Sequence, residues 1–250
     1  MPHDDPVLAH DLAARAGAAL VELRARLTAE GVAGAELKDA GDQVSHELLM
    51  AALAEAVPAD AVLSEEGKDD PARLAAARVW IVDPLDGTRE FSEPPRTDWA
   101  VHVALVVDGE LVAGAVALPA LERTLSTAVP PSLAPLPPGP PRLLVSRTRP
   151  PALAEALAEQ LGGSLVPMGS AGAKAMAVVQ GDAEIYAHGG GQYEWDNAAP
   201  VAVARAAGLH VSRLDGSDLR HNQPDPWSPD VLICRPELAD EVLRLLRPLL

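Results

Sequence analysis

The sequence predicts an α+β fold in which mixed β-sheets are layered with helices. A long antiparallel hairpin is expected in the first half, where apolar segments at residues 99–107 and 111–118 flank Asp108-Gly109, a dipeptide typical of tight turns. In the second half, strand-like and helix-like segments alternate along the chain. Hydrophobic residues make up 48% of the chain and charged residues 22%, which is typical of a globular protein.

Two helices and two short strands are expected before the hairpin. Residues 6–30 have helical periodicity, with Asp5 as the expected N-cap, Pro6 in the first turn and Gly31 just beyond the end. A second helix is expected over residues 44–57, ended by the proline that follows. Short apolar runs predict buried strands at residues 61–63 and 79–82.

A proline-rich stretch divides the chain. Residues 129–141 lack periodicity and predict a linker or long loop between an N-terminal α+β region, 1–128, and a C-terminal α/β region, 142–250. The elements expected in the C-terminal region are strands at 142–146, 183–187 and 231–234, and helices at 152–161, 171–180, 198–207 and 237–246.

Charge and composition exclude several classes of partner. The formal net charge of −16 repels nucleic-acid backbones and anionic lipid, so no nucleic-acid partner is expected. No apolar run approaches the roughly 18 residues of a membrane span, and the acidic N-terminus lacks the layout of a secretory signal. The single cysteine, Cys234, is expected to be an inert core thiol. These features predict a cytoplasmic protein without a membrane partner.

The most informative motif is the hexapeptide DPLDGT at residues 83–88, directly after a predicted strand. Proline and glycine force a tight turn there, which crowds two carboxylates, a backbone carbonyl and a hydroxyl onto one loop. Such oxygen-only crowding suits a hard divalent cation, Mg²⁺ in particular. The alternative is a surface turn in which Asp83 and Asp86 bond their own backbone.

Two further acidic elements occupy comparable positions. Glu65-Glu66 follows a predicted strand, and Asp196 opens a predicted helix. Taken singly, the glutamates read as solvated charge and Asp196 reads as a helix N-cap. Strand ends converge in layered α/β structures, however, and carboxylates that meet in a cleft repel one another unless cations lie between them. Together, these elements indicate a metal site.

The segments LSEE at 63–66, WIVDPLDGTREF at 80–91 and WDNAAP at 195–200 resemble the inositol monophosphatase superfamily of Mg²⁺-dependent, lithium-sensitive phosphatases. The REF tail at 89–91 and VSR at 145–147 look like its CysQ branch, the 3′-phosphoadenosine 5′-phosphate (PAP) phosphatases. The resemblance extends in order from about Lys38 to Cys234. It implies a layered αβαβα sandwich of the inositol monophosphatase/sugar phosphatase type, with two mixed sheets.

The resemblance also implies a ligand set for two or three Mg²⁺ ions. The implied ligands are Glu65 or Glu66, Asp83, the carbonyl oxygen of Leu85, Asp86 and Asp196. Asp83 would bridge the two principal ions. Of the two glutamates, Glu66 is favoured, although the sequence does not decide between them.

The family pattern assigns the chemistry to the end of the hexapeptide. Thr88 would position and deprotonate the attacking water, and the amides of Gly87 and Thr88 would receive the phosphate. Family members usually support this threonine with the aspartate of a Val-Thr-x-x-Asp stretch, but here Ser45 replaces the threonine and Glu47 falls one position short. Glu47 could take over after a local shift, Asp42 could do so, or a further metal is held differently.

A second anion-binding element is expected at residues 169–174. Small residues at a helix start expose backbone N–H groups, and Lys174 adds a positive charge, although close helix packing would explain the small residues equally well. A similar CysQ segment lies near the nucleotide, so Ser170 and Lys174 are expected to bind substrate, together with Asp86 and Asp196. Arg147 and Arg149 are further candidates.

The histidines are left out of this set. His102 and His188 have no second His or Cys at metal-ligand spacing, so both are expected to be structural.

The resemblance therefore implies a Mg²⁺-dependent phosphatase that hydrolyses the 3′-phosphate of PAP to AMP and phosphate. 3′-Phosphoadenylyl sulfate is a further substrate under this reading. The alternatives are an inositol-1-phosphatase, a fructose-1,6-bisphosphatase, or a non-catalytic module that binds metal or nucleotide. The expected partner is a small phosphate ester, with a homodimer as the expected assembly.

Overall fold

The computed structural model describes residues 4–148 and 150–250. The helices are α1 (Asp5–Ala29), α2 (Ala35–Ala56), α3 (Thr88–Phe91), α4 (Ala152–Leu161), α5 (Ala171–Gln180), α6 (Glu194–Ala206) and α7 (Ala239–Leu246). The strands are β1 (Ala61–Ser64), β2 (Arg78–Asp86), β3 (Ala100–Val107), β4 (Glu110–Leu118), β5 (Arg123–Ser126), β6 (Arg142–Ser146), β7 (Ser164–Met168), β8 (Ile185–His188), β9 (Gln192–Tyr193), β10 (His210–Ser212), β11 (Trp227–Ser228) and β12 (Val231–Cys234). Short 3₁₀ turns lie at Pro71–Ala75, Pro119–Leu121, Pro236–Leu238 and Arg247–Leu249.

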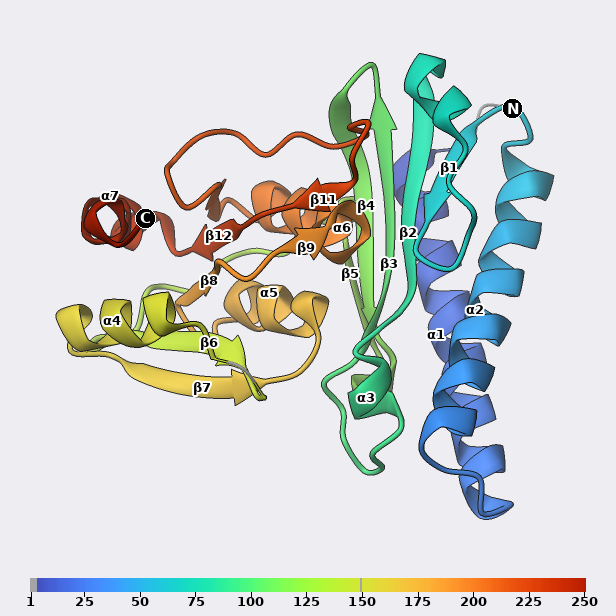
Figure 1. Ribbon diagram of the computed structural model, residues 1–250, viewed down its shortest axis with the longest axis horizontal. Helices are drawn as coiled ribbons and strands as arrows, with labels where there is room; N and C mark the ends of the chain where they lie inside the picture. The colour runs from blue at the N-terminus through green and yellow to red at the C-terminus, as the bar shows by residue number, and fades with distance from the viewer. Residues whose placement is uncertain (1–3, 149) are drawn as a thin grey trace.

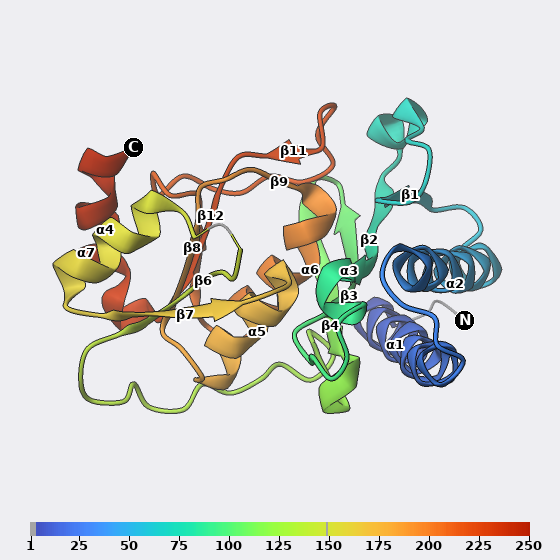
Figure 2. The same cartoon turned by 60° about the horizontal axis from the view of Figure 1, so that its bottom comes forward.

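The elements form five layers, which Figure 1 shows nearly edge-on. One sheet has the order β1-β2-β3-β4-β5, and the other has the order β10-β12-β8-β6-β7; each contains parallel and antiparallel pairs. Helices α1 and α2 cover the outer face of the first sheet, whereas α5 and α6 lie between the sheets and α4 and α7 cover the second sheet (Figure 2). The predicted αβαβα sandwich with two mixed sheets is confirmed.

Strand alternation in the first sheet separates its two faces. In β3, Val101, Val103 and Leu105 pack against α1 and α2, whereas Ala100, Ala104 and Val106 join the core toward α5 and α6. His102 shares the second parity, so this fully buried side chain faces the middle helical layer. Regular alternation thus turns a polar residue toward the space between the two sheets.

The pairing of β2 with β3 is irregular between Asp83 and Asp86. In an uninterrupted strand, residues three apart face opposite sides of the sheet. The bulge resets this alternation, so Leu85 packs toward α1 and α2 while both aspartates face the middle layer. The local irregularity therefore creates the acidic cluster described below.

Several predicted elements match the structure closely. The hairpin is confirmed, with Asp108 and Gly109 at φ 50° and 87°, as are α4, α5, β6 and β12 at their predicted bounds. Residues 129–141 contain no helix or strand, although the division into two regions at this loop stays a prediction. Cys234 is fully buried, and burial raises the pKa of its thiol to about 12, in line with an inert core residue.

Two predictions about the first helices are wrong in detail. The N-cap of α1 is Asp4, whose carboxylate accepts from the amide of Val7, and not Asp5. Helix α2 begins at Ala35, nine residues earlier than expected. Residues 35–43, for which no helix was predicted, therefore belong to it. The small and acidic residues of that stretch gave no apolar stripe, and packing of Leu37 and Gly41 against the first sheet stabilises the helix instead.

Within the residues that the structure describes, no helix combines the length and apolar character needed to cross a membrane.

Candidate active site

Three carboxylates from distant parts of the chain meet between the sheets. One oxygen from each of Asp83, Asp86 and Asp196 lies within 4.8 Å of the other two. Asp83 and Asp86 come from the end of β2, and Asp196 comes from the first turn of α6. Both β2 aspartates are buried and Asp196 is half-buried, so solvent screens their mutual repulsion poorly.

Asp86 is the most firmly held member of the cluster. Its Oδ2 accepts from Ser170 Oγ at 2.5 Å and from the amide of Gly172 at 2.7 Å, and it lies 3.2 Å from His102 Nε2. Burial alone would raise the pKa of Asp86, but His102, Lys174 and Ser170 together lower it to about 2. All of these contacts involve Oδ2, so the orientation leaves Oδ1 available to a cation.

The pKa values of the neighbouring carboxylates are shifted in the opposite direction, upward. Burial, with the charges of Glu65 and Asp86, raises the pKa of Asp83 well above its ordinary value. Burial and the charge of Asp86 likewise raise the pKa of Asp196 to about 6. The backbone holds both side chains, since Asp83 Oδ1 accepts from the Leu85 amide at 3.0 Å and Asp196 Oδ2 accepts from the Tyr193 amide at 2.6 Å.

Of the two adjacent glutamates, Glu65 interacts with all three aspartates of the cluster. Burial and the charges of Asp196 and Asp86 raise the pKa of Glu65 to about 7, although its hydrogen bond with Asp83 opposes the shift. The charge of Glu66, the residue that the sequence favoured, acts on Asp42 as well as on Glu65. Burial, then the charge of Glu66, raises the pKa of Asp42 to about 7. These interactions support Glu65 as the metal ligand, and the choice between the two glutamates stays a prediction.

Glu47, one of the predicted supports of Thr88, has a different partner in the structure. Glu47 is exposed on α2, where it accepts a hydrogen bond of 2.9 Å from Gln43. The contact from α2 to the hexapeptide comes from Ser45, whose Oγ donates to the carbonyl oxygen of Pro84 at 2.6 Å. Ser45 is fully buried, so the residue that replaces the family threonine still joins α2 to the turn of the hexapeptide.

The turn at Gly87 requires glycine. Its φ of 86° is left-handed, and an added Cβ would lie 3.1 Å from the Ser170 Cβ and 3.2 Å from the carbonyl oxygen of Asp98. Thr88 follows as the first residue of α3 and is half-buried. Thr88, the residue predicted to position the attacking water, thus lies two positions after Asp86. The turn that holds it packs against Ser170, directly before α5.

His102 is a site residue that the sequence analysis missed. Its Nε2 lies 3.2 Å from Asp86 Oδ2, and its Nδ1 lies 3.9 Å from Asp83 Oδ2 and 3.0 Å from the carbonyl oxygen of Trp195. Burial lowers its pKa, but Asp86 outweighs this effect and raises the pKa overall. Strand parity on β3 was the available signal, because it places His102 on the face toward Asp83.

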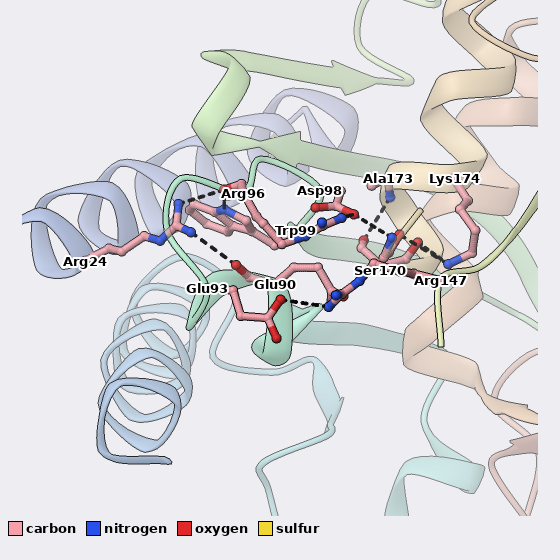
Figure 3. Close-up of polar contacts among 11 residues, drawn as sticks. Arg24, Glu90, Glu93, Arg96, Asp98, Trp99, Arg147, Ser170, Ala173 and Lys174 are labelled. Atoms are coloured by element: carbon pink, nitrogen blue, oxygen red, sulfur yellow. Dashed lines mark hydrogen bonds and ion pairs between the residues drawn. The ribbon is translucent and has the colours of Figure 1, made fainter. Parts of the chain in front are cut away.

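The segment at residues 169–174 reaches the cluster through Ser170, which caps α5 by accepting from the amide of Ala173 at 2.9 Å. The Lys174 ammonium is buried and donates to the carbonyl oxygens of Gly169 and Ser170, 3.2 and 2.5 Å away (Figure 3). Arg147 contacts Glu90 and Glu93. The other arginine candidate, Arg149, lies outside the described residues.

Helix α1 supports the loop that separates α3 from β3. The Arg24 guanidinium donates to the backbone carbonyl oxygens of Glu90 and Phe91, at the end of α3, and of Arg96 in this loop. From the same loop, the Asp98 carboxylate pairs with the Arg96 guanidinium and accepts from the amide of Gly169 at 2.6 Å (Figure 3). This chain of contacts fixes the start of the 169–174 segment, and through Ser170 it reaches Asp86.

The donor set fits Mg²⁺. The cluster offers carboxylate oxygens of Asp83, Asp86, Asp196 and Glu65, and hard oxygen donors are the ligands that Mg²⁺ prefers. Raised pKa values at three of these groups report repulsion and burial that a divalent cation would relieve.

Known proteins resemble this chain over most of its length. A model of the inositol monophosphatase family matches residues 3–130 and 144–249. A relative from Mycobacterium leprae, named 3′-phosphoadenosine 5′-phosphate phosphatase, is 49% identical over 255 residues, which are 97% of this chain and 93% of the relative. The relative from Escherichia coli named 3′(2′),5′-bisphosphate nucleotidase CysQ is 33% identical over 193 residues, with 72% and 77% covered.

Solved structures have the same fold. The structure of CysQ from Bacteroides thetaiotaomicron matches with a TM-score of 0.79 and 26% identity, over 92% of this chain and 96% of that chain. Inositol monophosphatase II from Staphylococcus aureus matches with a TM-score of 0.77 and 23% identity, over 96% and 92% of the two chains, which shows the fold alone.

Proposed function

Because this chain belongs to the inositol monophosphatase family of phosphoric monoester hydrolases, we propose that it is a Mg²⁺-dependent phosphatase that hydrolyses the 3′-phosphate of PAP. The products are AMP and phosphate, and 3′-phosphoadenylyl sulfate is a second substrate in this proposal. The observation that carries it is the convergence of Asp83, Asp86 and Asp196 on one buried cluster. The names of the relatives support PAP as the ester.

In this proposal the acidic cluster and the neighbouring backbone hold the metal. Glu65, Asp83 and the Leu85 carbonyl oxygen would bind the first Mg²⁺, and Asp83, Asp86 and Asp196 would bind the second. Bound Mg²⁺ would supply neutralising charge for the phosphoryl oxygens and would make a water nucleophilic at neutral pH.

The chain's own groups then orient the reactants. The Thr88 hydroxyl would accept a hydrogen bond from the attacking water and so position it, while the amides of Gly87 and Thr88 would donate to the phosphate. Ser170 and Lys174 contact the substrate on the α5 side, where the Ser170 hydroxyl also keeps the Asp86 carboxylate in place. Unaided phosphate monoester hydrolysis is extremely slow, so precise positioning and charge must together lower the barrier by many kcal/mol.

A phosphate-release panel tests the proposal. Purified protein with Mg²⁺ should hydrolyse PAP with a higher kcat/KM than inositol 1-phosphate or fructose 1,6-bisphosphate, and EDTA should abolish the activity. Asp83→Asn serves as the matched inactive variant, with circular dichroism to show that it folds. Absence of phosphate release from every ester would refute the enzymatic proposal. A higher kcat/KM for inositol 1-phosphate than for PAP would make inositol 1-phosphate the substrate instead.

The proposed assembly is a homodimer. Light scattering on the eluting peak of a size-exclusion column gives its mass directly, and a monomer mass of 26.0 kDa would refute it.

A further inference from the structure

A polar pocket of about 560 Å³ adjoins the acidic cluster. Ser170 lines this pocket and also donates to Asp86, so the pocket borders the proposed metal site. Arg89, another lining residue, directly follows Thr88 in the chain. A ligand whose ester phosphate lies at the cluster therefore has room to extend into this pocket.

The charge of this pocket departs from that of the whole protein. The formal net charge of the chain is −16, yet the described residues lining the pocket include Arg89, Arg147 and Lys174 against a single acidic residue, Glu90. Lys174 is already assigned to the α5 side of the substrate and donates to two backbone carbonyl oxygens. The two arginines are therefore the groups suited to bind an anionic part of a ligand, and guanidinium groups match phosphate geometry well.

Arg147 is already held by two carboxylates that differ in burial. Its Nε and Nη2 lie 3.1 and 2.7 Å from Glu90 Oε1, and Nη2 also lies 2.9 Å from Glu93 Oε2 (Figure 3). The Glu90 side chain is only 8% exposed, whereas the Glu93 side chain is 45% exposed. Glu90 is thus a fixed partner that orients the guanidinium, and Glu93 can move into solvent at little cost.

We propose that Arg89 and Arg147 select substrates that carry a second phosphate, and that Glu93 occupies Arg147 until this phosphate replaces it. The inference rests on the proposed function and adds a specificity site to it. A doubly charged phosphate with three acceptor oxygens is a stronger partner for a guanidinium than an exposed carboxylate. Glu93 therefore acts as an internal competitor that lowers affinity for the second phosphate without touching the reacting one.

A comparison of two substrates isolates this site. PAP and adenosine 3′-monophosphate share the reacting phosphate and the nucleoside, and only PAP carries the second phosphate. Arg147→Met should lower kcat/KM for PAP about tenfold, mainly through KM, and leave adenosine 3′-monophosphate unchanged. Arg89→Met should act in the same direction. Arg244→Met, which removes an exposed arginine on α7, is the matched control and should change neither substrate.

Glu93→Gln provides a test with the opposite sign. Removal of the competing charge should lower KM for PAP by about threefold or more and leave adenosine 3′-monophosphate unchanged. A gain of this kind cannot come from damaged folding. Calorimetric titration of PAP into each Mg²⁺-loaded variant provides the same comparison as a binding affinity, independent of turnover.

The outcomes separate the two proposals. Equal kcat/KM for both substrates in the wild type, or equal losses for both in Arg147→Met, would overturn the second-phosphate site while the phosphatase stands. An unchanged PAP affinity in Glu93→Gln would overturn the proposal that Glu93 competes with the second phosphate for Arg147. A protein that releases no phosphate but binds PAP in an Arg147-dependent manner would refute the reaction and support the site.

Discussion

Asp86 Oδ2 accepts a hydrogen bond of 2.5 Å from Ser170 Oγ, which joins residues 84 positions apart in the sequence. The contact links the end of β2 to the N-cap of α5, across the boundary between the first sheet and the middle helical layer. One oxygen of a proposed metal ligand is thereby fixed by the segment that is also proposed to bind substrate.

Ser170→Ala should weaken Mg²⁺ binding as well as the helix. The loss of a hydrogen bond to a charged carboxylate should raise the Mg²⁺ concentration for half-maximal activity about tenfold. Loss of the N-cap should lower the free energy of unfolding by about 1 kcal/mol. Asp70→Ala removes a comparable side-chain cap from the turn at Pro71–Ala75, so it should lower stability with no change in Mg²⁺ dependence. Equal Mg²⁺ dependence in both variants would contradict the role of Ser170.

Glu65 and Glu66 can be separated by neutral isosteres. Glu65→Gln should raise the Mg²⁺ requirement at least about a hundredfold, because loss of an outer-shell partner already costs about 10–100-fold. Glu66→Gln should have a much smaller effect, since Glu65 is the glutamate that interacts with Asp83, Asp86 and Asp196. Phosphate release measured at increasing Mg²⁺ concentration gives the Mg²⁺ requirement of each variant. A larger effect in Glu66→Gln would support Glu66 as the ligand.

Substitutions at Ser45 and Glu47 are predicted to differ in their effects on stability and activity. Ser45→Ala leaves the buried Pro84 carbonyl without its hydroxyl donor, which should lower the free energy of unfolding by about 1–3 kcal/mol and reduce kcat. Glu47→Gln changes an exposed side chain and should stay within about 0.5 kcal/mol of the wild type. Urea denaturation and kcat for PAP test both variants. A loss of activity confined to Glu47→Gln would contradict the structure.

Mg²⁺ stabilisation should increase with pH. Burial and neighbouring charge raise the pKa of Asp196 to about 6 and of Glu65 to about 7, so the metal-free fold is stabilised by their protonated forms at low pH. That stabilisation is lost as the pH rises through these values, whereas Mg²⁺ binds only the deprotonated forms. The increase in the free energy of unfolding caused by Mg²⁺ should therefore grow between pH 5 and 8. Each proton released contributes roughly 1.4 kcal/mol per pH unit.

Thermal unfolding in Mg²⁺ and in EDTA at each pH measures this difference. Glu65→Gln removes one of the titrating groups and should flatten the dependence. An equal Mg²⁺ effect at pH 5 and pH 8 would contradict the assigned shifts.

Much of the molecule could be predicted from local sequence. The Asp108-Gly109 turn, the strand before Asp83 and the helices at 152–161 and 171–180 follow from turn chemistry and hydrophobic period, which depend on neighbouring residues alone. The motifs also indicated the carboxylates that meet, because each lies at a strand end or a helix start.

Tertiary contacts decided what local sequence left open. The N-terminal half of α2 is set by packing of Leu37 and Gly41 on the first sheet, which no local period signals. The interaction of Glu65 with the three aspartates, the entry of His102 into the site and the pairing of Arg147 with Glu93 depend on which faces meet across the layers. A sequence pattern specifies the face of its own element, but the distances that select a ligand or a partner arise only when separate elements pack together.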